Sequence, residues 1–466
     1  MSDREHVHFI GIGGSGLSAI ARWLLESGYT VTGSDSAMSP FALDLQSVGA
    51  TVHLGHAAGN LAGADWVVRS SAIPDDNPEV VAALEQGIPV YKRADFLGRL
   101  MEAKTGIAVA GTHGKTTTTS MLAWTLSSIG EDPSFIAGSI VTNLGVNARA
   151  GKGKTFVIEA DEYDRMFLGL KPKIEVVTYV EHDHPDCYPT PEDFRAAFVD
   201  FVKLLPSDGT LVACGDEPGA AGVAAEARRM GRKVLLYGAA VTLGTSSDWV
   251  LAQNYKPNNK GGFSFDATVA GYSYPVALCI PGMHNLRNAL AVMGVIHVLA
   301  LSMTRAASAL GEFTGAGRRF EIRGEADRVT VVDDYGHHPT EIAATLAGAR
   351  SRYAQRRIWA VWQPHTYSRT RLLLDGFARA FGDADEVIVT EIYKSREPAQ
   401  DYSSQEVVKK MKHSSVKFIA DLSDVKDYLI SNLHAGDVLI VFSAGDADRV
   451  STQVLDQLRK REVRHV

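Results

Sequence analysis

The sequence has little cysteine and no hydrophobic run long enough to cross a bilayer. Its three cysteines, Cys187, Cys214 and Cys279, lie far apart and form no C-x-x-C pair. This spacing argues against a disulfide framework and against a cysteine-based zinc site, and it fits a reducing compartment. No apolar stretch approaches the roughly 18 residues that a spanning helix needs, and charged residues near Met1 lead straight into a strand-like run. We therefore expect a cytoplasmic protein that is neither exported nor anchored.

An excess of positive charge is also missing. The chain has 47 Lys and Arg against 54 Asp and Glu, which gives a formal net charge of −7. A balance of this sign provides no general attraction for nucleic acid or for an anionic membrane, so neither is an expected partner. Any bound phosphate must be held by local groups. The content of 45% hydrophobic and 22% charged residues is typical of a globular protein.

The chain is too long for one ordinary core. At roughly 150 residues per domain, 466 residues suggest about three domains. Short apolar runs alternate with helix-like stretches, the pattern of parallel sheets covered by helices. We predict an α/β protein with a Rossmann-like domain at 1–103, a central P-loop ATPase-type domain at 104–316 and a second Rossmann-like domain at 317–466. The central sheet is expected to be mostly parallel, with a small antiparallel patch between Trp249 and Cys279.

A glycine-rich turn follows the first expected strand, His6 to Ile10. It fits G-x-G-x-x-G and precedes a helix, and Asp35 ends the next strand about twenty residues on. Glycines let the backbone approach a pyrophosphate at a helix N-terminus, while the carboxylate can accept from a ribose hydroxyl. A dinucleotide and a UDP-sugar both carry these groups, and a plain tight turn would need glycine too. The candidate residues are Gly11, Gly13, Gly14, Ser15, Gly16 and Asp35.

A second glycine-rich turn gives the stronger signal. It lies between a strand and a helix and reads A-G-T-H-G-K-T-T, with Val109 where the full Walker pattern has its first glycine. Backbone N–H groups can hold phosphate oxygens, Lys115 can neutralise the β- and γ-phosphates, and the Thr116 hydroxyl can bind Mg²⁺. The predicted ATP-binding residues here are Gly111, Thr112, His113, Gly114, Lys115, Thr116 and Thr117.

Acidic and histidine residues follow the next two strands. Glu159 ends the strand Thr155 to Ile158, where an open α/β sheet places its ligands, and its carboxylate can hold a cation. The run Glu181-His182-Asp183-His184 could form a zinc site, complete a magnesium site or be a hydrogen-bonded structural loop. No third histidine or cysteine stands at convincing zinc spacing, so magnesium is favoured.

Polar residues at later helix starts and strand ends are further candidates. Asn285 and Asn288 share a helical face, as a nucleotide contact would require, although asparagine is also a good cap. Arg318 and Arg319 could reach a phosphoryl group or form a solvated basic pair. Two loops after buried strands, at 333–339 and 363–371, carry dense polar and charged side chains that packing does not explain. We expect them to face the ATP site and to form a pocket.

Taken together and in order, these segments resemble the Mur ligase family over nearly the whole chain. The motifs are G-I-G-G-S-G, A-G-T-H-G-K-T-T-T-T, E-A-D-E, E-H-D-H, G-x-H-N-x-x-N-A, G-R-R-F-E, D-D-Y-G-H-H-P-T-E and Q-P-H-x-Y-S-R-T-R. They look most like those of the alanine-adding branch. The resemblance implies ATP-driven, Mg²⁺-dependent ligation of L-alanine to the lactyl carboxylate of UDP-N-acetylmuramate through an acyl phosphate, in peptidoglycan precursor synthesis.

The resemblance also implies roles for individual residues. The first domain would bind the UDP-sugar, with Ser70 and Ser71 assigned to that site, and the third would bind the amino acid and close on ATP. The implied catalytic residues are Lys115, Glu159, His184 and Arg319. Thr116, Glu159 and His184 would bind magnesium, while Asn285, Asn288, Arg319 and Asp334 would contact ATP. The amino-acid and carboxylate pocket would contain Tyr335, His337, His365, Arg369 and Arg371.

Three other functions are considered. A ligase that reattaches a recycled tripeptide is the nearest, because Tyr163 in the acidic motif also occurs there, but the Q-P-H-x-Y-S-R-T-R segment argues against it. An NAD(P)-dependent oxidoreductase would leave the Lys115 loop without a purpose. A non-catalytic nucleotide-binding regulator is the third. We expect a monomer or a weak homodimer.

Overall fold

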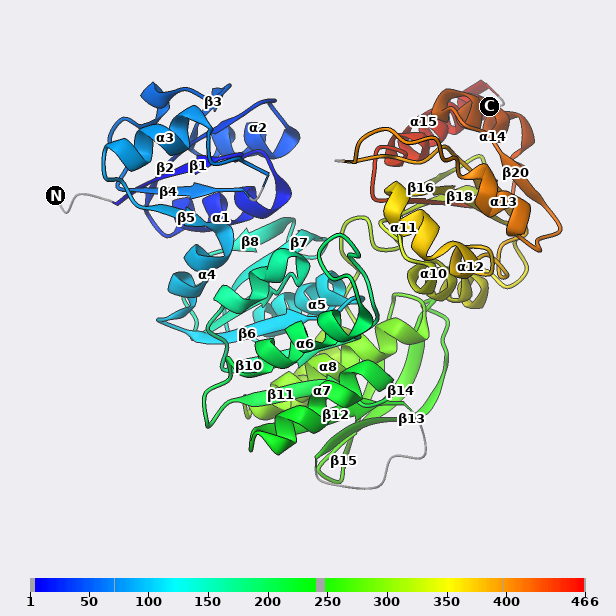
Figure 1. Ribbon diagram of the computed structural model, residues 1–466. Helices are drawn as coiled ribbons and strands as arrows, with labels where there is room; N and C mark the ends of the chain where they lie inside the picture. Colours follow the sequence, from blue (N-terminus) through cyan, green and yellow to red (C-terminus); the bar gives the residue numbers. More distant parts are fainter. Residues whose placement is uncertain (1–4, 71, 240–247, 396, 465–466) are drawn as a thin grey trace.

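The computed structural model describes residues 5–70, 72–239, 248–395 and 397–464, without the side chains of Ser15 and Arg464. It contains a five-stranded, a ten-stranded and a six-stranded sheet, which follow one another along the chain. In Figure 1 the ten-stranded unit lies at the bottom, with the first unit (blue) at upper left and the last (yellow to red) at upper right. The predicted three-part α/β architecture with mostly parallel sheets is confirmed.

The first sheet is parallel throughout and has the order β3-β2-β1-β4-β5. From β1 the chain builds the sheet outward to β3 and then returns to build the other side. The strand order reverses between β1 and β4, and open α/β sheets bind ligands beyond the carboxyl ends of the strands at such a point. The elements are β1 His6–Ile10, α1 Ser15–Glu26, β2 Thr30–Asp35, α2 Pro40–Ser47, β3 Thr51–Leu54, η1 Ala58–Leu61, β4 Trp66–Arg69, α3 Pro78–Glu85, β5 Val90–Lys92 and α4 Arg93–Met101.

The middle sheet has the order β15-β14-β13-β12-β11-β10-β6-β9-β7-β8. Its strands pair in parallel from β13 to β7, and β8, β14 and β15 pair antiparallel. The elements are β6 Thr105–Ala110, α5 Lys115–Ser128, β7 Ser134–Val141, β8 Val146–Arg149, β9 Thr155–Glu159, η2 Tyr163–Gly169, β10 Ile174–Val177, α6 Pro191–Val202, β11 Thr210–Cys214, α7 Pro218–Arg229, β12 Lys233–Gly238, β13 Trp249–Pro257, β14 Phe263–Val269, β15 Tyr272–Ala277, α8 Met283–Val298 and α9 Met303–Leu310.

The third sheet has the order β16-β17-β21-β18-β19-β20, and only β16 is antiparallel to its neighbour. Its central strands β17, β18 and β21 are fully buried, which explains the nearly continuous apolar sequences of β18 and β21. The elements are β16 Glu321–Ala326, β17 Val329–Asp334, α10 Pro339–Arg352, β18 Ile358–Gln363, α11 Tyr367–Leu372, α12 Leu374–Phe377, β19 Glu386–Val389, α13 Gln405–Lys410, β20 Val416–Phe418, α14 Leu422–Asn432, β21 Val438–Ser443 and α15 Asp448–Arg464.

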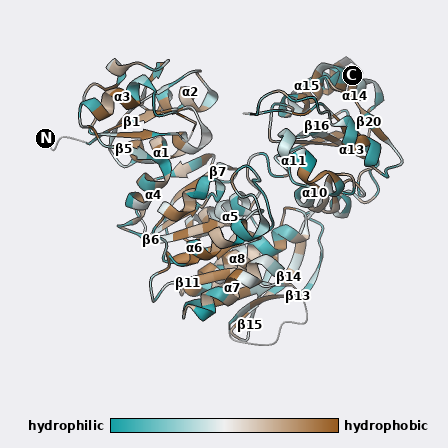
Figure 2. Ribbon diagram, in the orientation of Figure 1, coloured by the Kyte–Doolittle hydropathy of each residue, from teal (hydrophilic) through white to brown (hydrophobic). Residues whose placement is uncertain are grey.

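Hydrophobic residues concentrate on the strands inside each unit. Figure 2 shows brown along β1, β6 and β11, whereas the outer helices carry more teal. One continuous set of buried side chains extends from the first sheet into the middle one, and Trp23 of α1 stacks on Phe156 of β9 at 5.6 Å between ring centroids. The third unit has separate clusters on its two faces. Within the described residues, no helix is both long and apolar enough to span a bilayer.

Candidate active site

The second glycine-rich turn joins β6 to α5 as predicted. Gly111 has φ +138° and Gly114 has φ +82°, values that residues with a side chain rarely adopt. A Cβ on Gly111 would lie 2.1 Å from Thr178 Oγ1, and one on Gly114 would lie 2.7 Å from Asn288 Oδ1. The backbone therefore approaches its neighbours more closely than any larger residue allows. Its N–H groups lie at the N-terminus of a 14-residue helix, a position that favours anions.

Lys115 is held inside this turn by an acidic residue. Its Nζ donates to Gly111 O at 2.5 Å and lies 2.8 Å from a carboxylate oxygen of Glu162, whose side chain is 1% exposed. Burial would lower the pKa of Lys115, but the charges of Glu162, Asp161 and Glu159 outweigh it and raise that pKa. The ammonium is therefore charged and positioned beside the loop where phosphates would lie.

Thr116 and Glu159 form the predicted hydroxyl–carboxylate pair. The Thr116 hydroxyl donates to Glu159 Oε1 at 2.9 Å and accepts from Arg319 Nη2 at 3.3 Å. Glu159 ends β9, and its other oxygen accepts from Gly138 N at 2.6 Å. Oxygen atoms of this kind are the ligands that Mg²⁺ prefers, so the pair fits one side of a magnesium site.

His184 reaches the same region through Glu162. Its Nε2 lies 3.6 Å from Glu162 Oε1 and 3.8 Å from Asp183 Oδ2, and its backbone has φ +55°. Burial lowers the pKa of His184, but the hydrogen bond to Glu162 and the charge of Asp183 raise it overall. Glu162 thus connects the predicted histidine to Lys115. Tyr163, which follows Glu162, packs edge-on against the His184 ring at 5.1 Å.

A cavity of about 220 Å³ opens beside the turn, between the middle and third units. It collects most of the residues predicted to contact ATP, together with apolar side chains such as Ile280, Ala316 and Phe320. Asn288 donates to Asn285 Oδ1 at 3.2 Å, so these two amides form one polar edge of the cavity. The predicted residues that line it are His113, Gly114, Thr117, Asn285, Asn288, Arg319 and Asp334.

The Asp334 carboxylate holds the segment that carries Arg319 in place through hydrogen bonds to the backbone. Its carboxylate accepts from Phe320 N at 2.8 Å and from Gly336 N at 2.7 Å. Burial raises the pKa of Asp334 to about 6, although the charge of Arg319 acts in the opposite direction. The Arg319 guanidinium lies 5.0 Å from the centre of the Tyr335 ring, which leaves it directed at the cavity and at Thr116. Arg318, by contrast, pairs with Asp333 at 3.2 Å.

The Thr112 and His113 side chains turn toward the segment after β10. Thr112 Oγ1 donates to Glu181 O at 2.8 Å, and the Glu181 N–H donates to Thr112 Oγ1 at 3.0 Å. The His113 ring lies between two carboxylates: its Nε2 is 3.0 Å from Glu181 Oε2, and its Nδ1 is 3.2 Å from Glu341 Oε1. Burial would lower the pKa of His113, but those two carboxylates raise it to about 9.

Four of the five residues predicted for the amino-acid pocket lie together. Arg369 Nη1 is 3.2 Å from His365 Nδ1, and the His337 ring lies 6.3 Å from that of His365 and 5.5 Å from that of Tyr335. Arg371 is exposed. Its Nη1 donates to Gln400 Oε1 at 2.5 Å, and its guanidinium carbon lies 4.4 Å from the centre of the Tyr402 ring. Arg371 is therefore not part of this group among the described residues. Its side chain extends from the face of helix α11 opposite to that of Arg369.

The first glycine-rich turn follows the carboxyl end of β1, where the strand order of the first sheet reverses. Gly11 has φ +85°, and a Cβ on it would lie 3.2 Å from Ser70 Cβ, so Ser70 borders the turn. Asp35 Oδ2 accepts from Gly13 N at 2.8 Å, which means that this carboxylate already orders the loop. Gly14 is the N-cap residue of α1. A Cβ on Gly16 would meet Arg93 at 2.6 Å. The predicted Ser71 and the side chain of Ser15 lie outside the described residues.

Several residues without a predicted role are part of these sites. Glu162 belongs to the E-A-D-E motif and Asp183 to the E-H-D-H motif. Their place in the sequence near Glu159 and His184 is the feature that could have indicated a role in the site. Glu341 follows the D-D-Y-G-H-H-P-T run and contacts His113. Arg93 begins α4 and lies 4.0 Å from Asp161, between the first and middle units. Sequence patterns contain no information on that last contact, which joins two separate units.

Models of one protein family match successive parts of this chain. Three family models match: "Mur ligase family, catalytic domain" at residues 6–105, "Mur ligase middle domain" at 109–296 and "Mur ligase, glutamate ligase domain" at 318–445. The chain is 42% identical over 448 residues to the UDP-N-acetylmuramate–L-alanine ligase of Nitratidesulfovibrio vulgaris strain DP4, covering 95% of this chain and 97% of that protein.

Solved structures agree with these matches. The UDP-N-acetylmuramate–alanine ligase of Thermotoga maritima has a TM-score of 0.82 at 27% identity, covering 98% of this chain and 99% of that one. A murein peptide ligase from Psychrobacter arcticus has a TM-score of 0.71 at 26% identity, covering 98% and 99%. With nearly complete coverage by family models and by a relative above 40% identity, this chain belongs to the Mur ligase family.

Proposed function

We propose that this protein is an ATP-dependent, ADP-forming ligase that joins L-alanine to the lactyl carboxylate of UDP-N-acetylmuramate. The relative from N. vulgaris, whose name gives that activity, matches almost end to end. One structural observation carries the proposal: Lys115, Thr116 and Glu159 meet beside a cavity that Arg319 and Asp334 complete from the third unit. A phosphoryl-transfer site needs this combination of cations and oxygen ligands.

ATP fits the residues present. The cavity between Ile280, Phe320 and the paired amides of Asn285 and Asn288 offers apolar walls and a polar edge for a purine. Gly111 to Thr117 would then hold the phosphates through backbone N–H groups. Lys115 would exchange its contact with Glu162 for the β- and γ-phosphates, and Arg319 would approach the γ-phosphate from the other side.

Magnesium also fits. Thr116 and Glu159 supply adjacent oxygen ligands, and His184 with Glu162 supplies a second set close by. When bound, Mg²⁺ neutralises charge on the phosphate oxygens. Of these residues, Thr116, Glu159 and His184 are the proposed ligands. Arg319 donates to Thr116 and so fixes the direction of its hydroxyl.

The first and third units would supply the other substrates. We place the UDP-sugar at Gly11 to Gly16, with Asp35 and the Ser70–Ser71 pair beside it, and the domain limits at 1–103, 104–316 and 317–466. Arg93, which touches both Gly16 and the Asp161 region, lies on the path from this site to the ATP cavity. The pocket of Tyr335, His337, His365 and Arg369 would take the amino acid.

The reaction follows from the weakness of a carboxylate as an acyl donor. A carboxylate oxygen attacks the γ-phosphorus, the bond from that phosphorus to the β-γ bridging oxygen breaks, and ADP leaves. The alanine amine then attacks the acyl carbon, loses a proton and expels inorganic phosphate, so that an amide forms. Lys115 and Arg319 stabilise charge on the transferred phosphoryl group, and closure of the third unit brings the amine within reach.

ADP release in the presence of Mg²⁺ and UDP-N-acetylmuramate tests the proposal. We expect release to depend on the acceptor, with L-alanine, L-serine and glycine compared against the tripeptide of the recycling reaction. L-alanine should support turnover. Turnover with the tripeptide alone would establish the recycling ligase, which the likeness to the P. arcticus enzyme keeps as the second candidate. Nicotinamide reduction without ADP release would instead indicate the oxidoreductase. We further propose that the protein acts in the cytoplasm as a monomer or weak homodimer.

A further inference from the structure

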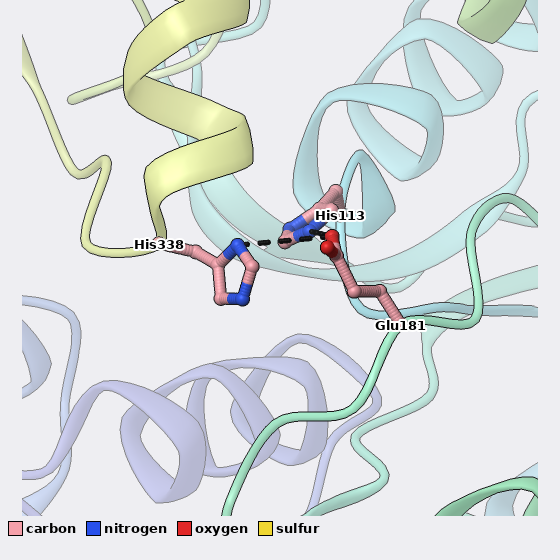
Figure 3. Close-up of side chains that lie close together, drawn as sticks. All are labelled: His113, Glu181 and His338. Atoms are coloured by element: carbon pink, nitrogen blue, oxygen red, sulfur yellow. Dashed lines mark hydrogen bonds and ion pairs between the residues drawn. The ribbon is translucent and has the colours of Figure 1, made fainter. Parts of the chain in front are cut away.

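Two histidines and one carboxylate converge at the boundary between the middle and third units (Figure 3). His113 lies in the turn before α5, and Glu181 lies in the segment after β10. His338 is the N-cap residue of α10. His113 Nε2 lies 3.0 Å and His338 Nδ1 lies 3.7 Å from the same oxygen of Glu181. All three potential ligand atoms lie within 4.8 Å of one another. Among the described residues, this is the one group of three such side chains with that spacing.

These separations are close to those of a tetrahedral transition-metal site. Zinc binds histidine nitrogen at about 2.0–2.1 Å and carboxylate oxygen at about 2.0–2.2 Å, which places neighbouring ligands roughly 3.3 Å apart. The two distances to Glu181, 3.0 and 3.7 Å, bracket that value. Side-chain movements of about 1 Å would therefore complete the geometry. The set of two imidazoles and one carboxylate suits zinc and its neighbours better than Mg²⁺, which prefers oxygen ligands.

The residues behind these three side chains hold them in the orientation that metal binding needs. Glu341 Oε1 lies 3.2 Å from His113 Nδ1, which can donate to that carboxylate, so Nε2 is the nitrogen that would release its proton to bind an ion beside Glu181. The Thr340 hydroxyl lies 2.9 and 3.1 Å from the two oxygens of Glu181. Thr340 N donates to His338 Nδ1 at 3.3 Å, a long hydrogen bond that a metal ion at this nitrogen would replace. A carboxylate behind a metal-binding histidine is the usual arrangement in metalloproteins.

Burial and access also fit a bound ion. The His113 and His338 side chains are 13% and 1% exposed, whereas Glu181 is 38% exposed and leaves a path from solvent. His338 Nε2 is buried without a hydrogen-bond partner. A buried imidazole that uses one nitrogen and leaves the other unpaired gains little as a structural residue. Its contribution to the fold is the cap on α10, which an asparagine could provide equally well.

We propose that His113, Glu181 and His338 form a binding site for a divalent transition-metal ion of the zinc class. The site is separate from the oxygen-rich group at Thr116 and Glu159. Because its ligands come from both the ATP-binding turn and the start of α10, a bound ion ties the third unit to the middle one. It therefore favours the arrangement seen here, with the cavity enclosed between the two units.

Zinc binding to the intact protein tests this site directly. After treatment with a chelator, the wild type and His338→Asn are titrated with ZnCl₂ against a chromophoric competitor. Asparagine keeps the helix cap and removes the ligand. We expect the wild type to bind one more zinc ion than the variant, or to bind it at least about tenfold more tightly, because even residues behind metal ligands contribute 10–100-fold. Zinc should raise the Tm of the wild type and not that of His338→Asn.

A second variant and a matched control complete the experiment. Glu181→Gln keeps an acceptor for Thr340 but loses the anionic ligand, so it should lose the same ion even if His338→Asn folds poorly. His182→Asn changes a neighbouring histidine whose Nε2 bonds to Tyr188 O at 2.8 Å, and it should bind zinc as the wild type does. Equal zinc stoichiometry and affinity in the wild type, His338→Asn and Glu181→Gln would overturn the proposal, as would absence of zinc binding by the wild type.

Discussion

Arg369 of the third unit donates two hydrogen bonds to Asp183 of the middle unit, from Nε at 2.9 Å and from Nη2 at 3.2 Å. Both side chains are almost fully buried, at 7% and 4% exposure. Burial raises the pKa of Asp183, but the Arg369 guanidinium and nearby histidines lower it far more. Asp183 also accepts from the His184 N–H at 2.7 Å. The pair therefore couples the position of the third unit to the loop that carries a proposed magnesium ligand.

Removing Arg369 should loosen that junction. Arg369→Ala leaves Asp183 buried without its cation, a change that typically costs about 3–5 kcal/mol. We expect a lower Tm and faster proteolysis between the middle and third units. The double variant Arg369→Ala with Asp183→Asn should recover much of the loss, because no unpaired charge remains. Arg371→Ala, on the same helix but exposed, should change stability by less than about 1 kcal/mol. Equal effects of the two single arginine variants would contradict this account.

Lys115 and Glu162 allow catalysis to be separated from stability. Lys115→Ala should abolish ADP release, because His113, the other positively charged side chain of the turn, is held between Glu181 and Glu341. The change also leaves Glu162 buried without its cation. Lys115→Ala with Glu162→Gln should therefore recover thermal stability and remain inactive. Circular dichroism melting and the ADP assay measure the two effects. Ligation by Lys115→Ala at the wild-type rate would refute the role of this residue.

The two glycines Gly114 and Gly28 form a natural comparison. Both have positive φ, +82° and +92°, but a Cβ on Gly114 meets Asn288 at 2.7 Å whereas one on Gly28 has no atom within 4 Å. Alanine at either position should cost about 1–2 kcal/mol of backbone strain. Gly114→Ala should in addition weaken Mg·ATP binding by more than about tenfold, because the turn and the Asn288 amide must separate. Equal ATP affinities of the two variants, measured by calorimetry, would contradict the proposal that this turn binds the phosphates of ATP.

Features encoded within a few neighbouring residues could be predicted from the sequence. The turns at Gly11 and Gly111 were recognised because glycines follow an apolar strand and precede a helix. Glu159 was placed correctly at a strand end for the same reason. The strand β3, Thr51–Leu54, and the edge strand β16, Glu321–Ala326, cannot be recognised in this way, because only one residue in each is buried and neither shows a hydrophobic pattern.

Contacts between distant segments could not be predicted in this way. Lys115 and Glu162 are 47 residues apart, and Asp183 and Arg369 are 186 apart. Their pairing depends on how the units pack, which periodicity and motif spacing do not describe. The same holds for the amino-acid pocket: Arg369 and Arg371 were both expected in it, and the pairing of Arg369 with Asp183 of the middle unit was not foreseen. Each residue turns an α-helix by about 100°, so side chains two residues apart on α11 point to nearly opposite sides, and Arg371 leaves the face that Arg369 occupies.

Asp334 should give the protein a characteristic dependence of stability on pH. Burial raises its pKa to about 6 in the folded state, against roughly 3.9 in an unfolded chain. The folded state then holds a proton that the unfolded state has released, so stability falls as pH rises from about 4 to about 6 and is level above that. At about 1.4 kcal/mol per pKa unit, this group contributes roughly 3 kcal/mol to the change. Asp334→Asn should therefore gain stability relative to the wild type across this window, measured by denaturant unfolding without nucleotide. Asp76→Asn, which removes an exposed carboxylate, controls for the loss of one charge, and a parallel pH profile for the wild type and Asp334→Asn would show that Asp334 ionises normally.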